Sequence, residues 1–339
     1  MPAREQRAPV SGTGPRFVGL RRDKRALGGG EGGPLTTESI KVGRRAVEIS
    51  NAGKLLFPDD GITKLDVARY YRRVASAMLP HVRGRPVSMR RFPEGVKREG
   101  FIQKEIPDHF PSWVKRVTVD RERGGKVTHA VCNNADTLVY LADQACITPD
   151  VWPSRVPKLK HPDRMIFDLD PAGGDFRPVR DAARILKEVL EKIGLVPFVM
   201  TTGGRGLHVA VPLSQKDDFD AVRAFSRDVA KLVAAREPDM LTTEQRKAKR
   251  RGRLFLDVMR NSYGQHAIAP YAVRATAGAP VATPLEWEEL GDGRLHAQRY
   301  TIRNVLDRLR RRDDPWKRIA RRGRSLSAPR RRLDALRSR

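Results

Sequence analysis

The spacing of apolar residues predicts a long helix early in the chain. Thr63-Lys-Leu-Asp66 has the spacing of a capping box, with Asp in place of the usual Glu or Gln. Apolar residues then recur at helical spacing, namely Leu65, Ala68, Tyr71, Val74 and Met78. We therefore expect a helix from this point to about His81.

The middle of the chain predicts a strand, a helix and a hairpin in that order. Residues 164–170 alternate apolar and polar positions toward their end, as a strand does, and a Gly-rich turn follows them. A helical pattern runs from Val179 to Ile193, and Gly194 stands where a helix end favours a positive φ. Residues 197–201 and 207–213 predict two strands joined by a short Gly-rich turn.

Three further elements and two tails complete the prediction. Residues 218–236 have a helical pattern, residues 253–259 a strand pattern, and a last helix is expected after Thr301. Residues 1–43 are rich in Gly, Pro and Arg without apolar periodicity, which predicts a disordered tail or linker. Residues 318–339 are expected to be a basic low-complexity extension, so that the globular body spans 44–317. Each end could contact a phosphate backbone or be a simple solvated tail.

The charge of the chain indicates a polyanionic partner. Its 67 Lys and Arg residues against 40 acidic ones give a net charge of +27, which would attract DNA, RNA or an anionic membrane surface. A run of about 18 apolar residues and the apolar core of a signal peptide are both missing from the sequence, which predicts a cytoplasmic location and no membrane partner. Cys132 and Cys146 lie in apolar stretches, so we expect buried thiols in preference to a disulfide or a metal site.

Three aspartates are candidates for binding divalent ions. Asp168 and Asp170 lie on one face of the predicted strand, since strand side chains repeat every second residue. Asp257 comes from a separate apolar strand, where a lone carboxylate needs a compensating partner. A metal shared by the three would suit phosphoryl transfer, which needs charge neutralised on the attacking and leaving oxygens. A pair of aspartates two residues apart also occurs by chance at strand ends that face solvent.

Basic side chains near glycines are candidates for binding phosphate. The segment from Thr202 to His208 carries glycines that allow backbone N–H groups to approach phosphate oxygens, with Arg205 and His208 beside them. His208 on an apolar strand could equally be a hydrogen-bonded core residue. Arg90, Arg91 and Lys104 stand in apolar or turn contexts, which fits substrate phosphates or a solvated face. The sequence leaves these alternatives open.

Short motifs throughout the body make the chain recognisable. They are Ile49–Lys54, Leu56–Pro58, Gly61–Lys64, Gly84–Pro86, Arg91–Gly95, Phe101–Lys104, Phe167–Pro171, Gly206–His208, Phe255–Asp257 and Ile268–Tyr271 with Arg274. With these motifs the chain, from about Val47 to Trp316, resembles the polymerase domain of bacterial ATP-dependent DNA ligase D in the archaeo-eukaryotic primase superfamily. The resemblance implies an α+β primase-like polymerase fold, with central mixed or antiparallel sheets flanked by helices.

The resemblance also implies an activity and its residues. It implies a metal-dependent polymerase of non-homologous end joining, which adds nucleotides or ribonucleotides to a primer 3′-hydroxyl at gaps and broken ends. Two Mn²⁺ or Mg²⁺ ions would be held by Asp168, Asp170 and Asp257. The other implied residues are His208, Arg205, Arg274, Arg90 and Phe101 for the nucleotide, and Lys54, Lys64 and Asn51 for the downstream 5′-phosphate.

The implied partners are gapped DNA, double-stranded DNA ends and nucleoside triphosphates. Since neither tail is long enough for a ligase domain, we expect a stand-alone polymerase. Its companions would be a separate ATP-dependent DNA ligase and the end-binding protein Ku. We also expect it to be associated with the bacterial nucleoid. Four positions depart from the family pattern, namely Ile102, Gly204, Asp150 and Thr276. Relatives often carry a histidine at the position of Asp150. These changes could leave a catalytically weak DNA-end-binding module, which is one alternative function; a primase is the other.

Overall fold

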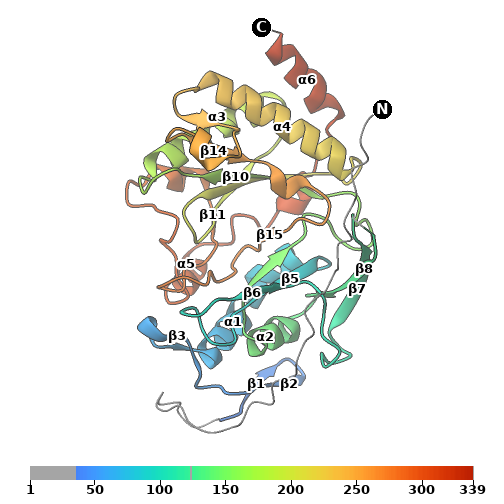
Figure 1. Ribbon diagram of the computed structural model, residues 1–339, viewed down its shortest axis with the longest axis vertical. Helices are drawn as coiled ribbons and strands as arrows, with labels where there is room; N and C mark the ends of the chain where they lie inside the picture. The colour runs from blue at the N-terminus through green and yellow to red at the C-terminus, as the bar shows by residue number, and fades with distance from the viewer. Residues whose placement is uncertain (1–35, 123, 339) are drawn as a thin grey trace, which may run out of the picture. The chain divides into compact units, whose positions relative to one another are not determined.

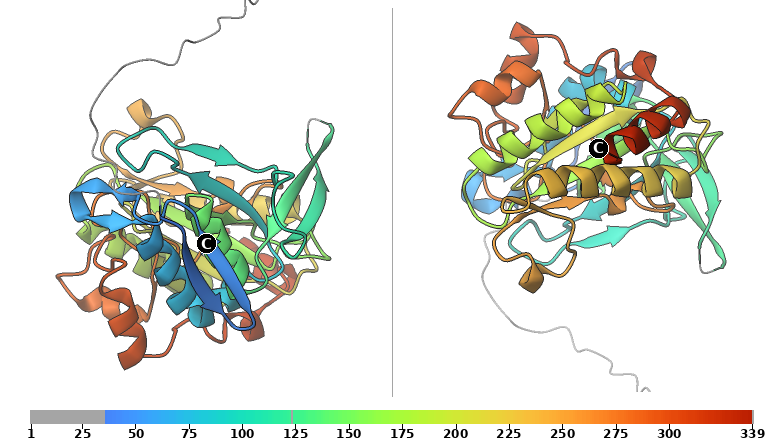
Figure 2. Two further views of the ribbon diagram at one scale, coloured as in Figure 1. Left: turned by 90° about the horizontal axis from the view of Figure 1, so that it is seen from below. Right: turned by 90° about the horizontal axis from the view of Figure 1, so that it is seen from above.

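Two six-stranded sheets form the centre of the fold, and helices cover their outer faces (Figure 1). The computed structural model describes residues 36–122 and 124–338, all within one compact unit, and most of the predicted N-terminal tail lies outside these residues. The α+β prediction, with sheets flanked by helices, is confirmed. Figure 2 shows the helices Arg177–Lys192, Phe219–Arg236 and Ser327–Arg337 on one side of the sheets, with the helices Lys64–Val82 and Ala135–Asp143 and the N-terminal hairpin on the other.

The first sheet has the strand order β15-β9-β5-β8-β7, and β6 pairs with β5 at its side. The strands are β5 Pro86–Arg91, β6 Phe101–Gln103, β7 Lys115–Asp120, β8 Lys126–Val131, β9 Cys146–Val151 and β15 Ala267–Ile268. Helices α1 (Lys64–Val82) and α2 (Ala135–Asp143) pack against it in one apolar core. The predicted capping box is confirmed, because Thr63 and Asp66 each accept a hydrogen bond from the backbone N–H of the other.

The second sheet has the order β13-β14-β10-β12-β11-β16 and is antiparallel except where β13 joins β14. Its strands are β10 Arg164–Asp170, β11 Phe198–Thr201, β12 Leu207–Pro212, β13 Leu241–Thr242, β14 Leu254–Asp257 and β16 Pro284–Leu285. Helices α3 (Arg177–Lys192) and α4 (Phe219–Arg236) cover its outer face and form a second core with it. The predicted hairpin is β11–β12, and its glycine turn is confirmed.

Smaller elements connect these layers. They are β1 Glu38–Val42, β2 Arg45–Ile49, β3 Leu55–Phe57, β4 Ile62–Thr63, α5 Val305–Arg311 and α6 Ser327–Arg337, with 3₁₀ turns at Pro58–Asp60, Lys247–Lys249, Met259–Asn261, Trp287–Gly291 and Ile319–Arg322. The predicted boundary of the N-terminal tail is too late, because β1 pairs with β2 and buries Ile40 and Val42. Both cysteines are buried free thiols, as predicted.

The strand predicted over residues 253–259 ends earlier, at Asp257. The Asp257 carboxylate accepts a hydrogen bond from the backbone N–H of Met259 at 2.7 Å, which turns the chain into a 3₁₀ segment. A short polar side chain that bonds to the backbone two residues later competes with strand pairing. The residue singled out for its chemistry therefore also terminates its own strand.

The C-terminal segment is not the low-complexity extension that the sequence predicted. Residues 327–337 form α6, whose Leu333 is fully buried in the core of the second sheet with Leu326. Before it, Arg324 forms an isolated β-bridge with Leu213, the residue after β12. Between its many arginines this segment carries a narrow apolar stripe, which is buried against α3 and α4.

Replacing Leu333 with Ala is expected to lower the free energy of unfolding by about 2–3 kcal/mol, because it leaves a cavity in a packed core. Arg331 on the exposed side of the same helix is the matched control, and Arg331→Ala should change stability by less than about 0.5 kcal/mol. Urea unfolding of the full chain measures both changes. Equal stabilities for the two variants would contradict the packing of α6.

Candidate active site

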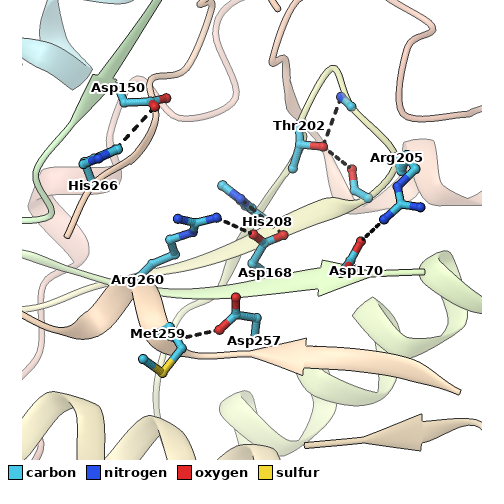
Figure 3. Close-up of polar contacts among 12 residues, drawn as sticks. Asp150, Asp168, Asp170, Thr202, Arg205, His208, Asp257, Met259, Arg260 and His266 are labelled. Atoms are coloured by element: carbon cyan, nitrogen blue, oxygen red, sulfur yellow. Dashed lines mark hydrogen bonds and ion pairs between the residues drawn. The ribbon is translucent and has the colours of Figure 1, made fainter. Parts of the chain in front are cut away.

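Strand register places three of the predicted residues in one row across the second sheet. Asp168 on β10 lies directly opposite His208 on β12 and directly opposite Asp257 on β14. Directly paired residues have their side chains on the same face, with Cβ atoms about 4.5–5.5 Å apart. Figure 3 shows the three side chains gathered on the face of β10 away from α3 and α4.

The two opposed carboxylates differ in their electrostatics. Burial raises the pKa of Asp168, but the nearby charges of His208 and Arg260, at 3.5 and 3.6 Å, outweigh it and the pKa is lowered. Burial raises the pKa of Asp257, and the charge of Asp168 raises it further, against the hydrogen bond from the Met259 N–H. Among the described residues no basic side chain forms an ion pair with Asp257. A cation between Asp168 and Asp257 would relieve this repulsion, so the donor set fits a hard metal ion.

Asp170 lies on the same strand face but is engaged elsewhere. Its two carboxylate oxygens contact Arg205 at 2.8 Å and Arg250 at 3.1 Å. Within residues 36–122 and 124–338, no three acidic, His or Cys side chains are already arranged as ligands of one ion. The predicted triad is therefore two facing carboxylates, with a third held aside by two guanidinium groups.

The glycine hairpin sets the close approach of β12 to β10. A Cβ atom on Gly206 would lie 1.9 Å from the backbone oxygen of Leu169, so only glycine fits beside Asp168 and Asp170. At the hairpin tip, the N–H of Gly204 donates to the Thr202 hydroxyl, and the Arg274 guanidinium approaches the same turn.

A hollow of about 240 Å³ lies beside Asp168 and His208. Its other lining residues include Arg90, Thr148, Asp150, Arg260, His266, Arg274 and Thr276. Burial lowers the pKa of Arg274, against the attraction of Asp150 and Asp168. Phe101, predicted to contact the nucleotide, does not line this hollow; it lies on β6 with 49% of its surface exposed, next to the equally exposed Ile102.

The predicted 5′-phosphate residues form a separate group. The backbone N–H of Lys64 donates to the Lys54 carbonyl at 2.8 Å, and the backbone N–H of Lys54 donates to the Asn51 carbonyl at 2.9 Å. These two hydrogen bonds bring the three residues together at the start of α1. The Lys64 ammonium is buried and bonds to Asp143 and Ser50, each at 3.0 Å. Lys54 is half-exposed, and its one ion-pair partner within residues 36–122 and 124–338 is the exposed Glu94. Of the two lysines, Lys54 is the one free to contact a ligand.

Sequence reasoning missed three residues of this region. Arg250 lies in a basic run, Arg260 follows Asp257 at a distance of three residues, and His266 is an isolated histidine. Arg260 could have been identified from the sequence, because it is a basic residue close to the candidate metal ligand Asp257. The sequence has no such signal for Arg250 or His266.

A family model described as the primase-polymerase domain of LigD matches residues 63–316. The chain belongs to this family. This LigD primase-polymerase domain is 34% identical to the multifunctional non-homologous end joining DNA repair protein LigD of Mycobacterium tuberculosis, over 80% of the chain's length. It is 30% identical to LigD of Pseudomonas aeruginosa, over 88% of the chain's length. A solved structure of the polymerase domain of M. tuberculosis ligase D in complex with DNA matches with a TM-score of 0.77 and 32% identity. That match covers 82% of this chain and 99% of the other.

These matches confirm the family inferred from the sequence motifs and the primase-like fold. This LigD primase-polymerase domain spans 34–43% of the length of the curated relatives that it matches. Along residues 36–122 and 124–338, the structure has no helix that combines the length and the apolarity needed to span a bilayer.

Proposed function

We propose that this chain is a DNA-repair polymerase of non-homologous end joining, which adds nucleotides or ribonucleotides to a primer 3′-hydroxyl at gaps and broken ends. The observation that carries the proposal is the direct pairing of Asp168 with Asp257 beside a hollow lined by basic groups. Two facing carboxylates suit divalent ions, and the basic lining suits a triphosphate. Membership of the LigD family and the DNA named in the related structure support the same reading.

Asp168 and Asp257, with Asp170 on the same strand face, would hold Mn²⁺ or Mg²⁺ ions. Such ions neutralise charge on the attacking and leaving oxygens of phosphoryl transfer. The phosphates of the nucleotide would be bound and oriented by three side chains that border the hollow, namely His208, Arg260 and Arg274. Asp170 would share its oxygens with Arg205 and Arg250 or release these arginines when an ion binds.

The downstream 5′-phosphate would bind at the first turn of α1. The backbone N–H groups of this turn are already bonded within the protein, so the ammonium of Lys54 and the side chain of Asn51 beside it would supply the contacts to the phosphate. Lys64, held by Asp143, would shape this pocket and add charge to it. The proposed partners are gapped and broken duplex DNA, a separate ATP-dependent DNA ligase and the end-binding protein Ku.

The test is nucleotide addition by the purified full chain on a gapped duplex with a 5′-phosphate. Ribo- and deoxynucleotides are compared, each with Mn²⁺ and with Mg²⁺. Addition that requires a primer and a divalent ion supports a polymerase. Synthesis on a single-stranded template without a primer would indicate a primase, and tight DNA-end binding without any addition would indicate the binding module.

Replacing Lys54 with Ala is expected to weaken binding of a 5′-phosphorylated gap about tenfold, because one charge-assisted hydrogen bond is lost. Binding of the same gap with a 5′-hydroxyl should change much less, since the dianion is then missing. Lys97, an exposed lysine that pairs with Asp59, is the matched control. Fluorescence anisotropy at fixed salt measures the affinities of the wild type and both variants for the two substrates, and equal losses on both substrates would argue against a phosphate contact.

A further inference from the structure

Asp150 is a buried carboxylate on the first sheet, facing the hollow from the side opposite Asp168. The residue is 1% exposed. One oxygen, Oδ2, accepts a hydrogen bond from Arg90 Nε at 2.6 Å and lies 3.3 Å from His266 Nδ1. Figure 3 draws the pair of Asp150 and His266 apart from the aspartates of the second sheet.

Strand register explains why these groups meet. Asp150 on β9 lies opposite Ser88 on β5 and opposite Ile268 on β15. Arg90 and His266 are each two residues from those partners, which makes them diagonal neighbours of Asp150 on the same face. That face lines the hollow that Asp168 and His208 border from the second sheet.

The charged groups around Asp150 keep its carboxylate ionised. Burial raises the pKa of Asp150, but the contacts with His266 and Arg90 outweigh it, and the pKa is lowered. The contact uses Nε of Arg90, and among the described residues the two terminal nitrogens of Arg90 have no hydrogen-bond partner. His266 likewise turns Nδ1 toward Asp150, so its Nε2 is left for another contact.

We propose that Asp150 is a positioning residue for the incoming nucleoside triphosphate, which fixes Arg90 by Nε and His266 by Nδ1 so that their remaining nitrogens bind the phosphates. A guanidinium held at Nε presents its two terminal N–H groups as a rigid fork, the geometry that matches a phosphate. The carboxylate also offsets the repulsion among Arg90, Arg274 and Arg260 before the nucleotide arrives. This inference rests on the proposed polymerase function.

The test is Asp150→Asn, which keeps the shape of the side chain and removes its charge. On the gapped duplex the KM for the nucleotide should rise about tenfold to a hundredfold, while kcat changes less than about threefold, because ground-state positioning is lost and the metal carboxylates are intact. Asp150→Glu, which retains the charge, should recover part of the affinity. The control is Asp120→Asn, an exposed carboxylate at the end of β7 in the same sheet.

Direct titration of the protein with a fluorescent nucleoside triphosphate and Mn²⁺, without DNA, separates this inference from the proposed function. Weaker triphosphate binding by Asp150→Asn supports the inference even if the wild-type chain extends no primer. Wild-type affinity and wild-type KM in a folded Asp150→Asn variant would overturn it. If this variant does not fold, Arg90→Lys serves instead, since it keeps the charge but replaces the fork of terminal N–H groups with a single ammonium; an unchanged KM there would overturn it equally.

Discussion

Asp168→Asn is expected to abolish nucleotide addition, with a loss of roughly a thousandfold or more, and to leave the fold and DNA binding intact. Asp168 stands at the centre of the row, opposite both Asp257 and His208. Asn is nearly isosteric but carries no charge, so the attraction for a divalent ion, and with it the stabilisation of charge in the transition state, is lost. Single-turnover extension of a primer on the gapped duplex measures the loss.

Asp181→Asn is the control for this experiment. Asp181 is a half-exposed carboxylate on α3 that pairs with Arg184 and Arg177 on the surface of the same helix. Its variant should extend the primer at the wild-type rate. DNA affinity, measured by anisotropy, should not fall in Asp168→Asn, because removing a negative charge does not weaken binding to a polyanion. Normal extension by Asp168→Asn would contradict the proposed role of Asp168 in binding the divalent ion.

Asp163→Ala is expected to lower the free energy of unfolding by about 3–5 kcal/mol, since it leaves buried guanidinium groups without their counter-charge. Arg85, only 1% exposed, lies 2.7 Å from Asp163 Oδ1, and Arg155 lies 2.7 Å from Oδ2. The third basic neighbour, Arg164, is also buried and lies over the Trp316 ring. This cluster connects α1, the first sheet and the start of β10, so its loss affects both halves of the fold.

The pH dependence of this effect has a definite sign. Burial raises the pKa of Asp163, but the charges of Arg85, Arg164 and Arg155 outweigh it and hold the pKa below its usual range. A carboxylate whose pKa is lower in the folded state than in the unfolded one contributes stability above about pH 4. That contribution is lost as the pH falls through the folded-state pKa. The difference between wild type and Asp163→Ala should therefore be constant from about pH 5 to pH 8 and shrink only in stronger acid.

The matched control is Asp228→Ala on α4. Asp228 also contacts two arginines, Arg330 at 2.6 Å and Arg337 at 3.8 Å, but on the surface, where solvent screens the pairs. Its removal should cost less than about 1 kcal/mol. Urea unfolding at several pH values measures both variants. A loss at Asp163 no larger than the loss at Asp228 would contradict the role given to the buried cluster.

The sequence determined the elements whose periodicity is strong and the motifs that identify the family. Apolar spacing predicted α1 with its capping box, α3, α4 and the β11–β12 hairpin, because these signals depend on residues close in sequence. The same local logic put Asp168 and Asp170 on one strand face. It failed for residues 327–337, where the buried stripe is too narrow to stand out among arginines until α3 and α4 supply the surface that covers it.

Only the tertiary structure decided which of the singled-out residues meet. Register between strands far apart in sequence put Asp257 opposite Asp168, turned Asp170 toward Arg205 and Arg250, and placed His266 beside Asp150. A shift of one residue in any of these pairings would send the side chains to the opposite face. Register is fixed by how each sheet buries its apolar face against its own helices, a property of the assembled layers that no local pattern contains.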